Sequence, residues 1–512
     1  MHGSSPGRSA AGQVLLWVAV AAALLVGCSA APGKSAAVGA SASSLAGSSE
    51  QGRKPNIIYV LTDDLSWNLV GYMPHVQQMS KQGTTFSNYF VTDSLCCPSR
   101  SSILTGQYPH NTGVFTNNGD DGGYGAFMKN GDEKKCYALA LQKAGYRTGF
   151  MGKYLNGYQP KDTSGTDHPY VPPGWNEWDV AGNGYPEFNY DLNENGKVVH
   201  YGHDPQDYLT DVVSAKAGSF IGSSAADSKP FMLELATFAP HEPSTPAPRD
   251  ANSYPGLKAP RSAAYDRLPA QAPKWQADLE PLSDKEKTQI DRKFAKRVRS
   301  VQAVDRLIGH LEDVLKEKGL ADDTYLVFGS DNGFHMGEHR LRPGKQTAFD
   351  TDIRVPMMVT GPDVPAGRTA SQLVQNTDLN PTFQQLAGLK PPSAVDGLSL
   401  VDLFHGSSPK DWRESVLVEH HHPGTSKGDP DAAPKESGNP PTYEALRTAD
   451  SLWIEYADGE REYYDTQADP AELKNLAGSP SDGREKALHE TLTALARCSG
   501  SESCRDASRL HH

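Results

Sequence analysis

The chain has 512 residues, enough for one large domain plus a smaller one or for two to three ordinary domains. Its content of 37% hydrophobic and 22% charged residues is typical of a globular protein. Its formal net charge is −13. Nucleic-acid-binding proteins carry a basic surface, so this charge argues against a nucleic-acid partner. An acidic average still permits a local cationic pocket for a small anion.

The N-terminal segment has the features of an export signal. Arg8 is followed by the apolar stretch VLLWVAVAAALLVG, which is too short for an ordinary membrane span and is typical of a secretory signal. The stretch ends at Cys28 in a pattern that resembles a bacterial lipoprotein signal. We therefore expect a signal peptide over 1–28, a flexible linker over 29–53, and an exported protein that is lipid-anchored to the cell membrane through Cys28. A plain secretory signal, giving an extracellular or periplasmic protein, is the alternative.

Apolar strands and helices alternate after the linker. Short apolar runs ending in polar residues predict buried parallel strands at NIIYVLTDD, KPFMLELATFAPHEP and TYLVFGSDNG. A long helix is expected over 283–318, with the charged stretch 285–299 facing solvent. This alternation predicts an α/β fold with a large, mostly parallel sheet flanked by helices. The pattern weakens after about 410, so we expect a catalytic domain over 54–410 and a small antiparallel subdomain over 411–512.

Polar side chains follow several of these strands. Asp63 and Asp64 end the first, Asp331 and Asn332 end another, and His241 follows a third. In α/β sheets, ligands bind beyond the carboxyl ends of the strands. Four oxygen-bearing side chains suit Ca²⁺ or Mg²⁺. Turn-forming Asp and Asn residues are the alternative for either pair taken alone.

The stretch CCPSRSSILTG places two cysteines at the start of an expected helix. Adjacent cysteines rarely pair with each other. A sulfur atom at a helix N-terminus lies where unpaired N–H groups stabilise negative charge, and Arg100, one turn further, can hold an anion. Cys97 with Cys136 is a possible disulfide. Cys498 and Cys504 bracket a short loop and are expected to pair in an oxidising compartment.

Together these motifs resemble the type I sulfatases of the alkaline phosphatase-like superfamily. The resemblance runs from about 54 to 480 and rests on the motifs VLTDD, CCPSRSSILTG, GKYLNGY, APHEP, SDNGFHMGEH, GKQTAFDTDIRVP and YYDTQADPAELKNL. GKYLNGY and PPGWNEW are most similar to the branch that contains glucosamine-6-sulfatases and extracellular endosulfatases. The resemblance implies an alkaline phosphatase-like fold.

The resemblance also implies a modified residue and a metal ion. The first cysteine of the motif, Cys96, would be converted to formylglycine (3-oxoalanine) by a formylglycine-generating enzyme. The hydrate of this residue would coordinate a Ca²⁺ ion, for which Mg²⁺ is a possible substitute. Four side chains would bind the same ion: Asp63, Asp64, Asp331 and Asn332. Arg100 would steady the hydrate, and Lys153 and Lys345 would neutralise charge on the sulfuryl oxygens. His241 would protonate the leaving alcohol.

The expected function is that of a sulfuric ester hydrolase acting on sulfate monoesters of a sulfated carbohydrate or an aryl sulfate. A phosphonate or phosphodiester hydrolase of the same superfamily is one alternative, and an inactive sulfoglycan-binding lipoprotein is another. His335 and His339 are further candidates for lining the pocket. Many sulfatases carry a histidine two residues after the first lysine. This chain has Leu155 there, followed by Asn156, a candidate sulfate ligand.

Overall fold

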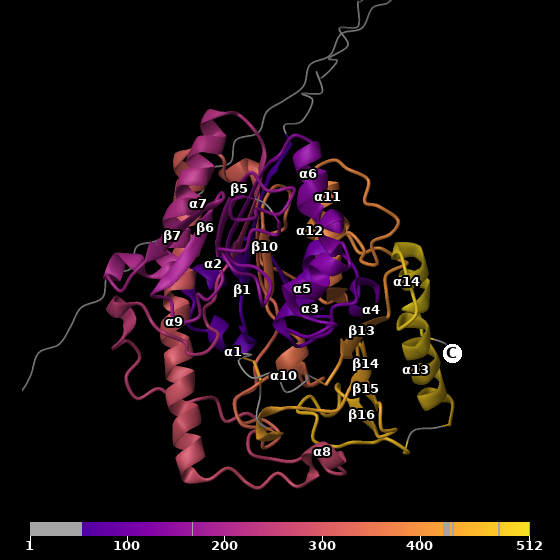
Figure 1. The fold of residues 1–512 in the computed structure, drawn as a ribbon. Coiled ribbons are helices and arrows are strands. Elements are labelled where there is room, and N and C mark those ends of the chain that lie inside the picture. Colours follow the sequence, from indigo (N-terminus) through magenta and orange to yellow (C-terminus); the bar gives the residue numbers. More distant parts are fainter. Residues whose placement is uncertain (1–53, 166, 423–430, 433–434, 480–481, 511–512) are drawn as a thin grey trace, which may run out of the picture. The chain divides into compact units, whose positions relative to one another are not determined.

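A ten-stranded sheet forms the centre of the computed structural model, which describes residues 54–165, 167–422, 431–432, 435–479 and 482–510 (Figure 1). The expected signal peptide, Cys28 and the linker lie outside the described residues. Within the described residues, no helix is both long and apolar enough to cross a membrane.

Five parallel strands form the middle of the sheet, and antiparallel pairings occur toward both edges. The strands in spatial order are β11 (Arg368–Ala370), β2 (Thr84–Phe86), β10 (Met357–Thr360), β9 (Thr324–Ser330), β1 (Asn56–Thr62), β8 (Phe231–Ala236), β4 (Arg147–Lys153), β5 (Glu177–Ala181), β6 (Tyr190–Glu194) and β7 (Lys197–Tyr201). The predicted mostly parallel α/β sheet is confirmed. A separate small pairing joins β3 (Tyr89–Phe90) to β12 (Val374–Gln375).

Both faces of the sheet are covered, which explains why its central strands are apolar throughout. Ile58 and Val60 of β1 pack into one hydrophobic core, whereas Ile57, Tyr59 and Leu61 pack into the other. Alternate residues of a strand point to opposite faces, so a strand buried on both sides has no polar face.

The longest helices in the core on one face are α2 (Pro74–Gln82), α7 (Leu209–Ala226) and α9 (Asp284–Glu317). The other face carries α3 (Cys96–Thr105), α6 (Tyr137–Lys143) and α11 (Leu379–Leu386) (Figure 1). Six shorter helices lie in the connections: α1 (Trp67–Val70), α4 (Pro109–Thr112), α5 (Gly123–Lys129), α8 (Lys274–Ala277), α10 (Asp350–Ile353) and α12 (Val401–Phe404). The long helix α9 begins one residue after the predicted start, because Ser283 and Glu286 form a capping box there.

A four-stranded antiparallel sheet follows near the C-terminus, as predicted. Its strands are β13 (Ser415–His420), β14 (Tyr443–Thr448), β15 (Ser451–Tyr456) and β16 (Arg461–Asp465). The helices α13 (Asp482–Leu495) and α14 (Ser501–Ala507) share a hydrophobic core with it.

Of the two disulfides considered from the sequence, one is present and the other is not. Cys498 and Cys504 form a disulfide, as expected. Cys97 and Cys136 do not pair: both are free thiols buried in the core between α3 and α6. The Cys136 thiol instead donates to the carbonyl of Asp132 at 3.7 Å.

Candidate active site

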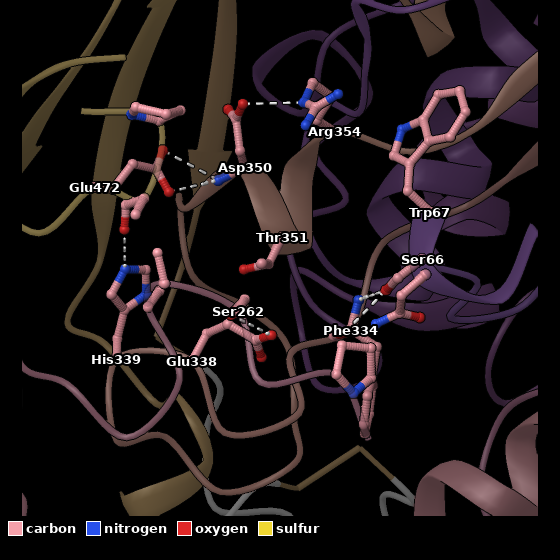
Figure 2. A pocket seen from close by; sticks show the side chains of 16 residues that line it. Ser66, Trp67, Ser262, Phe334, Glu338, His339, Asp350, Thr351, Arg354 and Glu472 are labelled. Atoms are coloured by element: carbon pink, nitrogen blue, oxygen red, sulfur yellow. Dashed lines mark hydrogen bonds and ion pairs between the residues drawn. The ribbon is translucent and has the colours of Figure 1, made fainter. Parts of the chain in front are cut away.

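Two cavities lie beyond the carboxyl ends of the central strands and share Phe334 as a wall. The larger, of about 340 Å³, is shown in Figure 2, where Trp67, Thr351 and Phe334 are among the residues around it. His339 lines this cavity, and its ring packs against Phe349 in a tilted arrangement with centroids 3.9 Å apart. The smaller, of about 90 Å³, is lined by residues of the predicted catalytic cluster, including His241 and Lys345.

The two pairs of carboxylate and amide residues meet because their strands are neighbours in register. Thr62 of β1 lies opposite Ser330 of β9, so the residues after each strand begin at the same level of the sheet. Asp64 adopts a left-handed conformation (φ 66°) that turns the chain. The Asn332 amide then donates to the Asp64 carboxylate at 2.7 Å, and the Asp64 N–H donates to Asp331 at 3.1 Å.

The sulfur of Cys96 lies at the N-terminus of α3, as its motif predicted. Cys96 is the first residue of that helix, and its thiol donates to Asp63 Oδ1 at 3.2 Å. Arg100, one turn further along α3, contacts two residues at the strand ends. Its Nε donates to Asp331 Oδ2 at 2.8 Å, and its Nη1 donates to the Lys153 carbonyl at 2.9 Å. Arg100 therefore holds the residues that follow β9 and end β4, and its Nη2 lies 3.9 Å from Asp63 Oδ1, the oxygen to which the Cys96 thiol donates.

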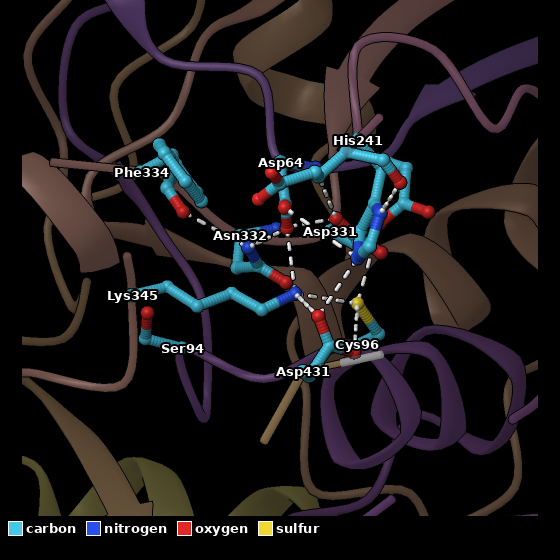
Figure 3. A network of polar contacts seen from close by, with 12 residues as sticks. Asp64, Ser94, Cys96, His241, Asp331, Asn332, Phe334, Lys345 and Asp431 are labelled. Carbon is cyan, nitrogen blue, oxygen red and sulfur yellow. Dashed lines mark hydrogen bonds and ion pairs between the residues drawn. The ribbon is translucent and has the colours of Figure 1, made fainter. Parts of the chain in front are cut away.

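Two lysines place their ammonium groups in the cluster. Lys153, the last residue of β4, places its ammonium 2.6 Å from Asp63 Oδ2. Lys345 Nζ lies 2.7 Å from Asp64 Oδ1 and 2.9 Å from Cys96 Sγ (Figure 3). Both side chains are buried, so these ion pairs act in a medium that screens them less than water does.

His241 follows β8 and presents Nε2 to the cluster. Its Nδ1 lies 2.7 Å from the Glu242 carbonyl, an acceptor, so Nδ1 carries a proton. Nε2 faces Asp431 at 2.7 Å and Asp64 at 3.8 Å. Burial lowers the pKa of His241, but the charges of Asp64, Asp63 and Asp431 outweigh it, and the net shift is upward.

Asp431 and Asn117 belong to this cluster although the sequence analysis did not single them out. The Asp431 carboxylate contacts His241 and also lies 2.8 Å from Lys345 Nζ. Asn117 donates to the other Asp431 oxygen at 2.7 Å and accepts from the Cys97 N–H at 3.0 Å. No local pattern marks Asp431, because it follows the contacting residues by far more than one supersecondary unit and lies in a Pro/Gly/Asp-rich stretch.

The position of Arg297 differs from the prediction that the charged stretch of the long helix faces solvent. The stretch 285–299 was expected to face solvent, but the Arg297 side chain is buried. Its guanidinium donates to the carbonyl oxygens of Asp64 and of Pro240, the latter at 3.3 Å, and lies 4.3 Å from the ring centroid of Phe334. Arg297 thereby links the loop that carries Asp64 to the loop that carries His241.

The electrostatics of the cluster make Cys96 a poor nucleophile as a thiol. Burial, reinforced by the charges of Asp431 and Asp63, raises the pKa of the Cys96 thiol well above its ordinary value. The thiolate is the reactive form of cysteine, and it is scarce at neutral pH under these conditions. By contrast, Lys153, His241 and Arg100 overcome the effect of burial and hold the pKa of Asp63 below its usual range.

The donor set fits a divalent cation that prefers oxygen. Ligand atoms of Asp63, Asp64, Cys96 and His241 lie within 4.8 Å of one another. Asn332 Oδ1 is buried and has no hydrogen-bond partner among the described residues, although its amide nitrogen is satisfied. Burying an acceptor without a partner costs free energy, and coordination of a cation would remove that cost. Asp331 stands beside them, and burial raises the pKa of its carboxyl to about 6.

The remaining candidates lie at the edge of the cluster or outside it. His335 is buried with Nδ1 2.9 Å from the Asp352 carboxylate, and it is not among the described residues that line the catalytic cavity. Asn156 donates to the Tyr185 hydroxyl at 3.4 Å. The Tyr185 ring lies 4.9 Å from Lys153 Nζ and 4.6 Å from the His241 ring, so Asn156 is connected to the cluster through that ring.

Comparison with known proteins identifies the family. Residues 55–389 match the family model described as Sulfatase, and residues 337–497 match a model described as N-sulphoglucosamine sulphohydrolase, C-terminal. The chain belongs to the sulfatase family, a class of sulfuric ester hydrolases.

Relatives place the chain within that family. The N-acetylglucosamine-6-sulfatase of Capra hircus is 34% identical over 490 residues, which cover 90% of this chain and 86% of that protein. An extracellular sulfatase homologue of Drosophila melanogaster is 35% identical over 377 residues, covering 72% of this chain and 33% of that longer protein. This chain is a sulfatase of the N-acetylglucosamine-6-sulfatase-like branch, so the predicted family and branch are confirmed.

A solved structure supports the same fold. It is described as a complex with its substrate D-glucosamine-2-N,6-O-disulfate, is 23% identical, has a TM-score of 0.73, and covers 88% of this chain and 98% of its own. The expected alkaline phosphatase-like architecture is confirmed.

Proposed function

We propose that this sulfatase cleaves the sulfate monoester of a sulfated sugar by using Cys96 as formylglycine beside a divalent cation. One observation carries the proposal: the Cys96 sulfur lies at a helix N-terminus between the Asp63 carboxylate and the Lys345 ammonium. A residue placed this centrally suits conversion to the nucleophile of the reaction.

The proposed cation would be held by the cluster at the strand ends. Asp63, Asp64, Asp331 and Asn332 supply its oxygen donors. When bound, Ca²⁺ or Mg²⁺ would polarise a sulfuryl oxygen and favour ionisation of a nearby hydroxyl. Arg100 would keep Asp331 oriented toward it through the 2.8 Å ion pair.

The chain's own side chains account for the rest of the proposed reaction. Formylglycine at position 96 would supply two hydroxyls as its hydrate, one to attack sulfur and one to release sulfate afterwards. Lys153 and Lys345 would neutralise charge that develops on the sulfuryl oxygens. As the bond between sulfur and the sugar oxygen breaks, His241 would give the departing alcohol the proton on Nε2. The hydrogen bond from Nδ1 to the Glu242 carbonyl supports this role, because it orients the ring with Nε2 toward the cluster.

The name of the Capra hircus relative indicates which ester to test first. N-acetylglucosamine 6-sulfate carries its sulfate on a primary alcohol, a poor leaving group that needs the proton supplied by His241. An aryl sulfate, whose leaving group is stable without a proton, is the matched second substrate.

The test has a chemical and a kinetic arm. The full chain is expressed with a formylglycine-generating enzyme, and the tryptic peptide that ends at Arg100 is weighed and fragmented. We expect aldehyde oxygen in place of sulfur at Cys96 and an unchanged Cys97. Cys96→Ser should lose activity, because a serine hydroxyl can accept the sulfuryl group but has no second hydroxyl to expel it. Cys97→Ser, the matched control, should stay active.

Rates on three substrates separate this proposal from the alternatives. Wild-type protein should hydrolyse the sugar sulfate and the aryl sulfate faster than an aryl phosphodiester or phosphonate. Faster phosphodiester or phosphonate cleavage would favour the second hydrolase activity. An unmodified Cys96 with no turnover of any ester would instead favour a sulfoglycan-binding protein.

We also propose, from the N-terminal sequence pattern alone, that the protein is exported and lipid-anchored through Cys28. Wild-type protein made in a lipoprotein-processing bacterium should fractionate with membranes, and Cys28→Ala should release it. Membrane association of both proteins would argue against the lipid anchor.

A further inference from the structure

The Asp431 carboxylate takes the polar contacts that a sulfuryl group would need in the catalytic cavity. Oδ1 lies 2.7 Å from His241 Nε2 and 2.8 Å from Lys345 Nζ. Oδ2 accepts from the Asn117 amide at 2.7 Å and lies 3.6 Å from the Cys96 sulfur. Only 3% of the Asp431 side chain is exposed. Figure 3 shows this carboxylate lying between Lys345 and Cys96.

The partners of the Asp431 carboxylate are the same protein groups that contact the substrate in the proposed reaction. Lys345 and His241 were assigned to a sulfuryl oxygen and to the ester oxygen, and Cys96 to the attacking position. A carboxylate and a sulfuryl group both present anionic oxygens, so one set of donors can serve either but not both. Two like charges in one buried site also repel each other.

The size of the cavity supports the same conclusion. With Asp431 in place the cavity measures about 90 Å³, whereas pockets that bind small ligands measure about 300–1,000 Å³. The catalytic cavity is therefore smaller than a usual ligand pocket while the Asp431 side chain lies in it.

We propose that Asp431 is an internal anion that occupies the sulfuryl position in the free protein and is displaced by a sulfate monoester or by inorganic sulfate. This inference rests on the proposed function of the same cavity. Asp431 thereby weakens the binding of substrate and of product sulfate by the same factor. It acts as a determinant of sulfate affinity that the C-terminal part of the chain contributes.

Displacement requires movement of the Asp431 side chain, whereas its backbone is held. The Asp431 carbonyl accepts from the Gln346 side chain at 3.0 Å, which ties the backbone beside Lys345. Rotation of the side chain would exchange its two ion pairs for hydration, while the incoming anion takes over Lys345 and His241. Because those two cations remain buried, an anion must replace the carboxylate there.

Two substitutions and a matched control test the inference. Asp431→Ala removes the competing anion, and Asp431→Asn keeps the shape but removes the charge. Glu436→Gln removes an exposed carboxylate from the same part of the chain. Each protein is made as the full chain with a formylglycine-generating enzyme. Inorganic sulfate is assayed as a competitive inhibitor of aryl sulfate hydrolysis and is titrated directly by calorimetry.

The expected result is a tighter sulfate site in both Asp431 variants. For Asp431→Ala, the inhibition constant of sulfate should fall at least about tenfold, because two buried cations lose their anionic partner. The KM for the aryl sulfate should fall in parallel, Asp431→Asn should show a smaller fall, and Glu436→Gln should match the wild type.

Two results would overturn the inference. One is an unchanged or weaker affinity for sulfate in both Asp431 variants. The other is a loss of kcat confined to esters of poor leaving groups with unchanged sulfate affinity, which would make Asp431 a positioning residue for His241. Failure of the wild type to hydrolyse any sulfate ester would instead contradict the proposed function. In that case the calorimetric comparison of wild type with Asp431→Ala still decides whether Asp431 competes with sulfate.

Discussion

His110 joins the catalytic part of the chain to the C-terminal sheet, and its charge predicts how stability depends on pH. It lies in α4, with Nδ1 2.9 Å from the Glu419 carboxylate of β13 and Nε2 2.8 Å from the Cys498 carbonyl. Both of these partners accept hydrogen bonds, so the geometry favours a ring that is protonated on both nitrogens. Burial by itself lowers the pKa of His110, but the hydrogen bond and charge of Glu419 outweigh it and raise the pKa to about 9.

The magnitude follows from the difference between the folded and unfolded pKa values. A shift from 6.5 to about 9 corresponds to about 3 kcal/mol, at about 1.4 kcal/mol per pKa unit. The ring is 16% exposed, so solvent screening makes this an upper value. Because the folded-state pKa is the higher one, the stabilisation is fully present below pH 6.5 and is lost as the pH rises through about 9.

The assay compares the free energy of unfolding of wild-type protein and His110→Gln in urea between pH 6 and pH 9. The wild type should lose up to about 3 kcal/mol more than the variant over this range. His489→Gln is the matched control, since it breaks a histidine–glutamate pair at 2.8 Å whose imidazole is 47% exposed. It should follow the wild-type pH dependence. Parallel pH profiles for wild type and His110→Gln would refute the reasoning, whatever their absolute stabilities.

Three further predictions concern the active site. Arg297→Met should lower kcat/KM at least about tenfold, because it frees the loops of Asp64 and His241, while circular dichroism shows a retained fold. An unchanged kcat/KM would contradict that role. His241→Ala should slow hydrolysis of N-acetylglucosamine 6-sulfate about 10²- to 10⁴-fold but affect an aryl sulfate much less. Equal losses on both esters would exclude an acid role. Asp331→Ala should reduce activity at least about 100-fold, and a chelator should reproduce this in the wild type until Ca²⁺ or Mg²⁺ is restored. Full activity in chelator-treated protein would rule out the cation.

The sequence determined the features that depend on short stretches of chain. Burial on both faces of the sheet requires apolar strands, so β1 and β9 could be recognised from composition. Their polar ends could then be assigned to one edge, because parallel strands share a direction. The long helix α9 could be recognised from its apolar spacing, and its start lies at the capping residues Ser283 and Glu286, which act within one turn. The catalytic roles of individual residues came from the resemblance to sulfatases, since spacing alone does not fix them.

Only the tertiary structure decided which distant side chains meet. Arg297 lies in a stretch whose charge indicates a solvated face. It is buried because carbonyl oxygens of two loops, contributed by other parts of the chain, face that position. The sequence allowed a disulfide between Cys97 and Cys136, but the packing of α3 against α6 buries them as separate thiols. Asp431 reaches Lys345 and His241 from a stretch with no regular pattern. Such contacts depend on how the sheet, helices and loops pack together. The local conformational propensities of the residues do not predict that packing.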